Sequence, residues 1–286
     1  MEMIVFPVYN SGVKNSDGIN GEKMQVETAS LCGFKMKYCS FGTGKRVFVI
    51  LPGLSVRNVT DSAEAVAKAY GAFTDTFTVY LFDRREDVPE GYSIRDMADD
   101  TAAVIRSLGI GSAALFGASQ GGMIAQMLAI AYPELVERLI LGSTACEISP
   151  FFAERCESWK RLASEHDHRG LTETFVDWMY GEDTLRLRRE TLLASTPTYT
   201  DAELSRFLRL VDAFHGFTTR ETLSGIACPT LVLAAKGDQV FGYKASLEIA
   251  DILGCEIHLY GSGYGHAVYD EAPDYIPRMG SFCGTK

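Results

Sequence analysis

The sequence of 286 residues predicts an α/β fold, with a mostly parallel central sheet, helices on both faces and an inserted, mainly helical region. Three observations support this prediction. Apolar strand-like runs alternate with helical patterns between residues 45 and 141, and short connections join them. No buried strand is apparent between residues 146 and 225, where helical spacing and aromatic residues dominate. The alternation of strands and helices resumes at residue 230.

The amino-terminal part of the core is predicted to be antiparallel. Residues 1–25 are rich in turn-forming residues, so we expect a surface arm or hairpin there. Residues 26–31 and 34–40 have strand patterns, and the second alternates through Phe34, Met36 and Tyr38. These two strands are expected to form a hairpin at an edge of the sheet.

Buried strands and amphipathic helices follow in alternation. Continuous apolar runs such as residues 47–51 fit strands that are covered on both faces. Ser93 and Asp96 form a start resembling a capping box, and Gly109 ends the helix that begins there. The strands are expected at residues 45–51, 76–82, 112–116 and 139–141, and the helices at residues 59–73, 93–108 and 120–132.

Residues 146–225 are predicted to form a helical cap, whereas residues 26–145 and 226–286 form the α/β core. Most of the aromatic residues of the cap are expected to fill the space between cap and core, and we assign none of them to the site. The core resumes with a strand at 230–234, a helix at 244–253, a strand at 256–260 and a last helix after Pro273.

Composition excludes several classes of function. The formal charge of −10 and the absence of long basic clusters argue against a nucleic-acid surface. Short basic pieces such as Arg84-Arg85 are expected to form a solvated face or an internal ion pair. No run is long enough for a membrane span, the first residues lack the pattern of a signal peptide, and the seven cysteines are scattered. We expect a cytoplasmic protein, without metal or cofactor, that is a monomer or homodimer.

The most informative motif is Gly117-Ala118-Ser119-Gln120-Gly121, a G-x-S-x-G pattern. It lies between an apolar strand-like run and a helical run, which is the context in which this pattern places a serine nucleophile on a sharp turn. A serine hydroxyl needs a neighbouring base, and the base needs a group that orients it.

His266 and Asp238 are the predicted partners of Ser119. Of the five histidines, His266 alone occupies a loop after the carboxyl end of a strand. Asp238 also follows a strand, and it lies between Ser119 and His266 in the sequence. Because catalytic groups gather beyond the carboxyl ends of parallel strands, the three residues are expected to meet there.

Two backbone amides are predicted to form an oxyanion hole, the set of donors that stabilises the negative oxygen of a tetrahedral intermediate. The Gln120 amide follows the nucleophile at a helix N-terminus. The second donor is assigned to the Leu54 amide, which Gly53 leaves exposed, with Ser55 as a less favoured alternative.

These motifs make the chain resemble the α/β-hydrolase superfamily, in particular its single-domain serine hydrolases with a helical cap, over about residues 30–283. The chain departs from the usual pattern at Pro52, where many relatives have histidine, and at Arg85, where many have glycine. The matching pieces are Leu51-Pro52-Gly53-Leu54, Phe82-Asp83-Arg84-Arg85, Tyr92-Ser93-Ile94, Ala98-Asp99-Asp100, the Ser119 motif, Gly237-Asp238, Gly265-His266 and Glu271-Ala272-Pro273.

The resemblance implies attack of Ser119 on an ester-like carbonyl, an acyl-enzyme, and hydrolysis by a water that His266 activates. The expected substrate is a small or medium carboxylic ester, lactone or thioester. Two alternatives stay open: non-hydrolytic use of the same triad, in acyl transfer, carbon–carbon or hydroxynitrile cleavage or cofactor-free peroxide chemistry, and a ligand receptor without turnover.

Overall fold

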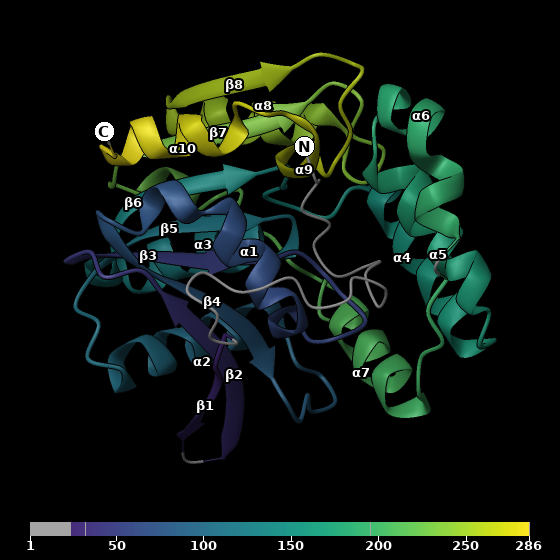
Figure 1. Ribbon diagram of the computed structural model, residues 1–286, viewed down its shortest axis with the longest axis horizontal. Helices are drawn as coiled ribbons and strands as arrows, with labels where there is room; N and C mark the ends of the chain where they lie inside the picture. The colour runs from purple at the N-terminus through teal and green to yellow at the C-terminus, as the bar shows by residue number, and fades with distance from the viewer. Residues whose placement is uncertain (1–23, 32, 195, 286) are drawn as a thin grey trace.

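The computed structural model describes residues 24–31, 33–194 and 196–285, and these residues form a sheet of eight strands (Figure 1). The spatial order is β1-β2-β4-β3-β5-β6-β7-β8; β2 runs antiparallel to β1 and β4, and the other pairs are parallel. This confirms the predicted fold class. The predicted arm at residues 1–25 lies outside the described residues except for its last two. The strands are β1 Val26–Leu31, β2 Phe34–Phe41, β3 Arg46–Leu51, β4 Phe77–Arg85, β5 Ala113–Ala118, β6 Val136–Gly142, β7 Thr230–Ala235 and β8 Glu256–Tyr260.

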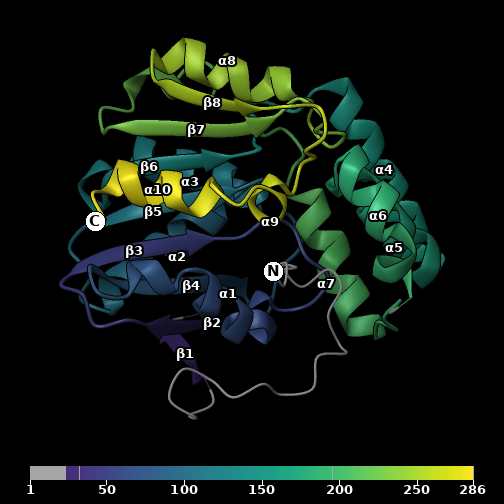
Figure 2. The same cartoon turned by 45° about the horizontal axis from the view of Figure 1, so that its top comes forward.

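Helices cover both faces of the sheet because successive residues of each central strand point to opposite sides. In β3, Phe48 and Ile50 pack with α1 and α10, whereas Val49 and Leu51 pack with α2 and α3. Figure 2 shows α1 and α10 on the near face and α2 and α3 behind it. None of the described helices is long and apolar enough to cross a lipid bilayer. The core helices are α1 Ala63–Ala69, α2 Ile94–Ser107, α3 Gln120–Ala131, α8 Tyr243–Leu253, α9 Val268–Glu271 and α10 Tyr275–Cys283.

The prediction of one continuous helix over residues 59–73 is wrong. The segment forms a 3₁₀ turn η2 (Val59–Ser62), the short helix α1 and a second 3₁₀ turn η3 (Gly71–Phe73). Gly71 follows α1, and a glycine costs a helix interior about 1 kcal/mol relative to alanine. The Phe73 N–H bonds instead to the Tyr70 carbonyl at 2.9 Å, which tightens the chain into the 3₁₀ form.

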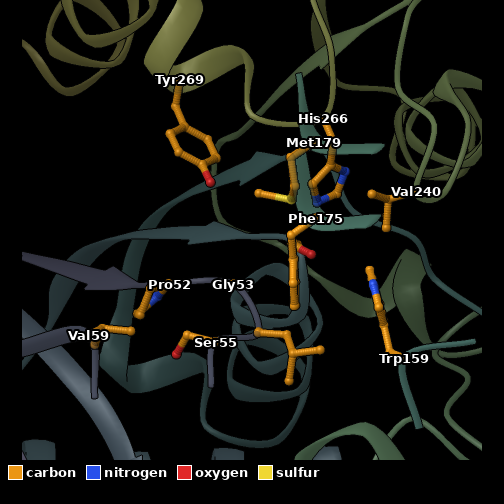
Figure 3. Close-up of a pocket in the computed structure, with 12 residues that line it drawn as sticks. Pro52, Gly53, Ser55, Val59, Trp159, Phe175, Met179, Val240, His266 and Tyr269 are labelled. Atoms are coloured by element: carbon orange, nitrogen blue, oxygen red, sulfur yellow. The ribbon is translucent and has the colours of Figure 1, made fainter. Parts of the chain in front are cut away.

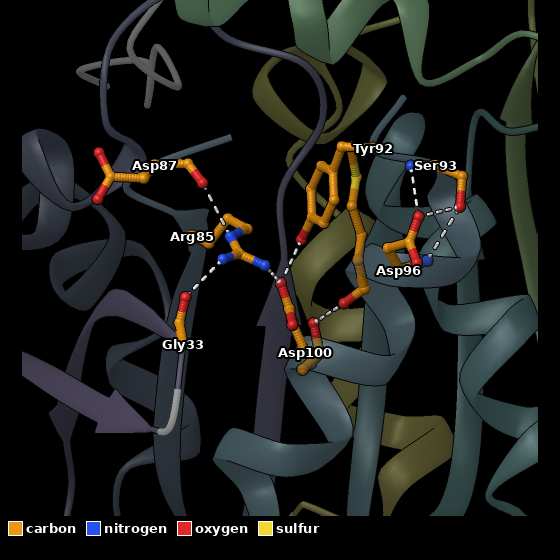
Figure 4. A network of polar contacts seen from close by, with 9 residues as sticks. Gly33, Arg85, Asp87, Tyr92, Ser93, Asp96 and Asp100 are labelled. Carbon is orange, nitrogen blue, oxygen red and sulfur yellow. Dashed lines mark hydrogen bonds and ion pairs between the residues drawn. The ribbon is translucent and has the colours of Figure 1, made fainter. Parts of the chain in front are cut away.

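The start of α2 has the predicted capping box. Ser93 Oγ accepts from the Asp96 N–H at 3.1 Å, and Asp96 Oδ2 accepts from the Ser93 N–H at 2.8 Å (Figure 4). Two of the otherwise unpaired N–H groups at the helix end are thereby satisfied.

Arg85 connects the carboxyl end of β4 to neighbouring segments of the chain, as Figure 4 shows. Its guanidinium donates to the carbonyls of Gly33 at 2.8 Å and Asp87 at 2.9 Å. It also lies 3.4 Å from Asp100 Oδ2, which accepts from the Tyr92 hydroxyl at 2.7 Å. The predicted internal ion pair is therefore found at Arg85.

Four helices between β6 and β7 gather at the carboxyl ends of the sheet strands (Figures 1 and 2). They fall within residues 146–225. Arg206 of α7 donates to the buried Asp83 carboxylate at 3.0 Å, and Glu203 of the same helix pairs with Arg57 at 3.1 Å. Helix α7 is thus bonded directly to the core beside β4. The helices are α4 Pro150–Ser164, α5 His168–Met179, α6 Glu182–Leu193 and α7 Asp201–Asp212.

Candidate active site

Ser119 lies at the sharp turn between β5 and α3. Its backbone has φ 54° and ψ −120°, a conformation that residues with a side chain rarely adopt. The Ser119 N–H donates to the Gly142 carbonyl at 2.9 Å, and the Ser119 carbonyl accepts from Thr144 Oγ1 at 2.8 Å. Bonds on both sides of the residue thus hold it in a strained conformation, which is a common property of functional positions.

Two glycines beside Ser119 allow this turn because side chains would collide there. A Cβ atom at Gly117 would overlap the Gly121 carbonyl oxygen. A Cβ atom at Gly121 would overlap the carbonyl oxygen of Leu51 on the neighbouring strand. The spacing of the motif therefore reflects the close approach of α3 to β3 and β5.

Replacing Gly121 by alanine is expected to lower the free energy of unfolding by about 1–3 kcal/mol, because backbone atoms must move to admit the methyl group. The matched control is Gly111→Ala, since a Cβ atom there meets nothing within 4 Å. We expect the control to change the free energy by less than about 0.5 kcal/mol. Urea unfolding followed by circular dichroism measures both, and equal stability of the two variants would contradict the packing argument.

Asp238 and His266 form a buried pair beyond the ends of β7 and β8. His266 Nδ1 lies 2.9 Å from Asp238 Oδ2, and both side chains are 1% exposed. The other carboxylate oxygen of Asp238 accepts from the N–H groups of Val240 at 2.7 Å and Phe241 at 3.1 Å. Because an ionised carboxylate only accepts, the pair places the imidazole proton on Nδ1 and leaves Nε2 free as a base.

The loop that carries His266 is fixed by a second carboxylate. Glu271 Oε2 accepts from the Gly265 N–H at 2.6 Å, and Glu271 Oε1 accepts from the Gly181 N–H at 2.8 Å. Gly181 lies between α5 and α6, so one side chain joins the His266 loop to the inserted helices. Burial raises the pKa of Glu271, although the two N–H donors oppose that shift.

The two amides predicted as oxyanion donors lie on either side of Ser119 in the fold. Gln120 begins α3, and a Cβ atom on Gly53, the residue before Leu54, would lie 3.2 Å from Ser119 Cβ. Neither the Leu54 N–H nor the Gln120 N–H donates to another described residue. Both groups are therefore free to bind a ligand oxygen.

A cavity of about 30 Å³ joins the predicted residues (Figure 3). Ser119, His266 and Leu54 line it together, whereas Asp238 stands behind His266. The volume admits only a water molecule or two. Ser55, the less favoured alternative donor, also lines the cavity. The remaining lining residues, which were not assigned to the site from the sequence, are Pro52, Gly53, Val59, Trp159, Phe175, Met179, Val240 and Tyr269.

Three of these unassigned residues come from the inserted helices. Trp159 of α4 and Phe175 of α5 stack with ring centroids 5.1 Å apart, and Met179 lies one turn further along α5. Their helical spacing indicates a buried face but not which cavity that face borders. Contacts between segments that are distant in the sequence decide which cavity a helix face borders. The sequence therefore contains no local signal that these residues line the site.

Of the basic pair Arg84-Arg85, Arg84 has surroundings that differ from the prediction. Arg84 is buried, with 4% exposure, and it forms no ion pair with a carboxylate of the described residues. Its guanidinium instead donates to backbone carbonyls and to the side chain of Gln120. The prediction of a solvated or ion-paired arginine is therefore wrong for Arg84.

Comparison with known proteins gives a family match over most of the chain. The model of the alpha/beta hydrolase fold family matches residues 47–273. A protein of Serratia proteamaculans (strain 568) named "Putative carbamate hydrolase RutD" is 27% identical over 195 residues, which are 63% of this chain and 70% of that protein. The 3-oxoadipate enol-lactonase 2 of Acinetobacter baylyi is 24% identical over 213 residues, 72% of this chain and 76% of that protein.

Solved structures share the same architecture. MGS-M2, an alpha/beta hydrolase enzyme from a Medee basin deep-sea metagenome library, superposes with a TM-score of 0.82 at 20% sequence identity. The match covers 91% of this chain and 98% of that one. At this identity the superposition supports the fold alone.

Proposed function

The chain belongs to the alpha/beta hydrolase family, and from this premise we propose that it is a serine hydrolase that cleaves small ester-type substrates through an acyl-enzyme on Ser119. The observation that carries the proposal is the geometry of the site. Ser119, on a strained turn, and His266, which is paired with the buried Asp238, line one cavity. The two amides beside them have no partner among the described residues.

The proposed reaction has two halves. His266 Nε2 takes the proton of Ser119 as Oγ attacks the substrate carbonyl, and the carbonyl oxygen becomes an oxyanion between the Leu54 and Gln120 amides. The intermediate collapses, the bond to the leaving group breaks, and His266 gives its proton to that group. Water then attacks the acyl-enzyme with His266 again as base, releasing the acid and restoring Ser119.

The names of the relatives are consistent with acyl chemistry. A carbamate and an enol-lactone both contain a carbonyl bonded to a heteroatom, which is the group that an activated serine attacks. We therefore propose carboxylic esters, lactones and thioesters as the substrate class of this chain.

Substrate size follows from the cavity. The cavity beside Ser119 measures about 30 Å³, and Trp159, Phe175 and Met179 of the inserted helices are among its lining residues. We expect a long acyl chain to displace these residues. Longer acyl chains require larger displacements of packed aromatic rings, so we expect short acyl groups to react fastest.

A series of p-nitrophenyl esters from acetyl to octanoyl, with a lactone and a thioester, tests this function. We expect hydrolysis of the short esters and a kcat/KM for octanoyl that is lower by at least about tenfold, a difference of about 1.4 kcal/mol. Acyl transfer to an added alcohol without release of acid would favour the non-hydrolytic alternative. If the protein binds these compounds but neither hydrolyses them nor is labelled at a serine by a fluorophosphonate probe, the receptor alternative is favoured.

A further inference from the structure

Arg84 lies at the carboxyl end of β4 and is buried although it carries a charge. Burial lowers the pKa of Arg84 to about 10, so the guanidinium stays positive at neutral pH. The Asp83 carboxylate favours that charge, but it bonds to Arg206 and not to the Arg84 guanidinium. Burying a cation without a direct ion pair is costly, so the groups that it does bind are informative.

The first of these groups is the loop that follows β3. Arg84 Nη2 donates to the Pro52 carbonyl at 2.5 Å and to the Gly53 carbonyl at 3.2 Å. The Gly53 carbonyl belongs to the same peptide unit as the Leu54 N–H. Because a trans peptide is planar, its carbonyl and N–H point in opposite directions. Holding the Gly53 carbonyl on Arg84 therefore fixes the Leu54 N–H in the direction away from Arg84.

The second group is the side chain of Gln120. Arg84 Nη2 donates to Gln120 Oε1 at 3.0 Å, and Gln120 Nε2 donates to the Leu210 carbonyl of α7 at 2.9 Å. The Gln120 side chain is fully buried, so these bonds fix it between core and inserted helix. One nitrogen of Arg84 therefore contacts the Gly53 carbonyl, whose peptide unit carries the Leu54 N–H, and the side chain of Gln120. The Leu54 and Gln120 amides are the two proposed oxyanion donors.

We propose that Arg84 is a positioning residue that aims the Leu54 and Gln120 amides at the oxyanion, an inference that rests on the proposed hydrolase function. Arg84 does not line the cavity, so it acts through the backbone and not on the substrate. Its charge also polarises the Gly53–Leu54 peptide and makes the Leu54 N–H a stronger donor. Donors fixed in advance stabilise the transition state more than the bound ester, so the effect falls on kcat.

The test replaces Arg84 by methionine and measures ester hydrolysis together with inhibition by an alkyl trifluoromethyl ketone, which forms a tetrahedral oxyanion on the serine. We expect kcat to fall by about 10- to 100-fold, with KM changed by less than about threefold. The inhibition constant should rise by the same factor as kcat/KM falls. The neighbouring Arg85→Met is the control, because Arg85 binds the carbonyls of Gly33 and Asp87 and not those of the oxyanion loop.

The outcomes separate this role from the function on which it rests. If wild-type protein hydrolyses the esters but Arg84→Met keeps the kcat and inhibition constant of Arg85→Met, the role of Arg84 is overturned alone. If wild-type protein neither hydrolyses the esters nor binds the ketone, the proposed function is overturned and this role with it. Should Arg84→Met fail to fold, Arg84→Lys keeps the charge but not the reach, and unchanged kcat in that variant overturns the role.

Discussion

Replacing Ser119 by alanine is expected to lower kcat for ester hydrolysis by on the order of a million-fold and to abolish labelling by a fluorophosphonate probe. The alanine variant has no oxygen to attack the carbonyl, so neither the acyl-enzyme nor the phosphonylated enzyme can form. No described residue depends on a hydrogen bond from Ser119 Oγ, and therefore the variant should fold as the wild type does. Intact-protein mass spectrometry of the labelled protein and ester kinetics measure the two effects.

Ser55→Ala is the matched control for this variant. Ser55 lines the same cavity, but its hydroxyl donates to the Arg57 carbonyl at 2.8 Å. We expect the control to be labelled like the wild type and to keep kcat within about tenfold. Labelling that persists in Ser119→Ala, or that disappears in Ser55→Ala, would show that the nucleophile has been assigned to the wrong serine.

The fold could be predicted from the sequence because its signals are local. Continuous apolar strands such as β3 and β7 are buried on both faces, and the helix stop at Gly109 and the capping box at Ser93 mark boundaries within a few residues. The segment at residues 59–73 was predicted less well. Its apolar positions fit a helix, but the packing of Tyr70 and Phe73 on Phe48 and the glycine at 71 favour the tight turn η3 at its end.

The site likewise contains residues that a local sequence signal predicts and residues whose role depends on long-range contacts. Ser119, Asp238 and His266 each follow a strand end, and a parallel sheet brings such ends together, so their proximity could be expected. Arg84 could not be assigned from its neighbours. Its partners lie 31 to 36 positions away in the sequence, and a basic pair at a strand end indicates solvent exposure at least as well as burial.

The inserted helices meet the site through backbone atoms as well as through side chains. The Leu210 carbonyl of α7 accepts from Gln120, and the Gly181 N–H donates to Glu271, which also holds Gly265 beside His266. A displacement of these helices that enlarges the cavity would therefore act on the residues beside both the proposed oxyanion donors and the proposed base. We therefore expect substrate entry and the alignment of the proposed catalytic groups to be coupled.

Replacing Asp238 by asparagine is expected to lower kcat by about 10⁴-fold without unfolding the protein. Asparagine keeps an oxygen that can accept from the Val240 and Phe241 amides, as Asp238 Oδ1 does at 2.7 and 3.1 Å. Its NH₂ group then faces His266 Nδ1, which must accept instead of donating. The imidazole proton moves to Nε2, and the atom that should take the serine proton carries one already.

Asp238→Ala separates this effect from loss of structure. Alanine removes the acceptor of both amides as well as the partner of His266. We therefore expect the free energy of unfolding to fall by about 1–3 kcal/mol, in addition to the loss of activity. Asp251→Asn, at an exposed position of α8, controls for the loss of one charge. Since only the tautomer argument predicts a stable but inactive Asp238→Asn, wild-type kcat in that variant, with an unchanged melting temperature, would exclude Asp238 as the residue that orients His266.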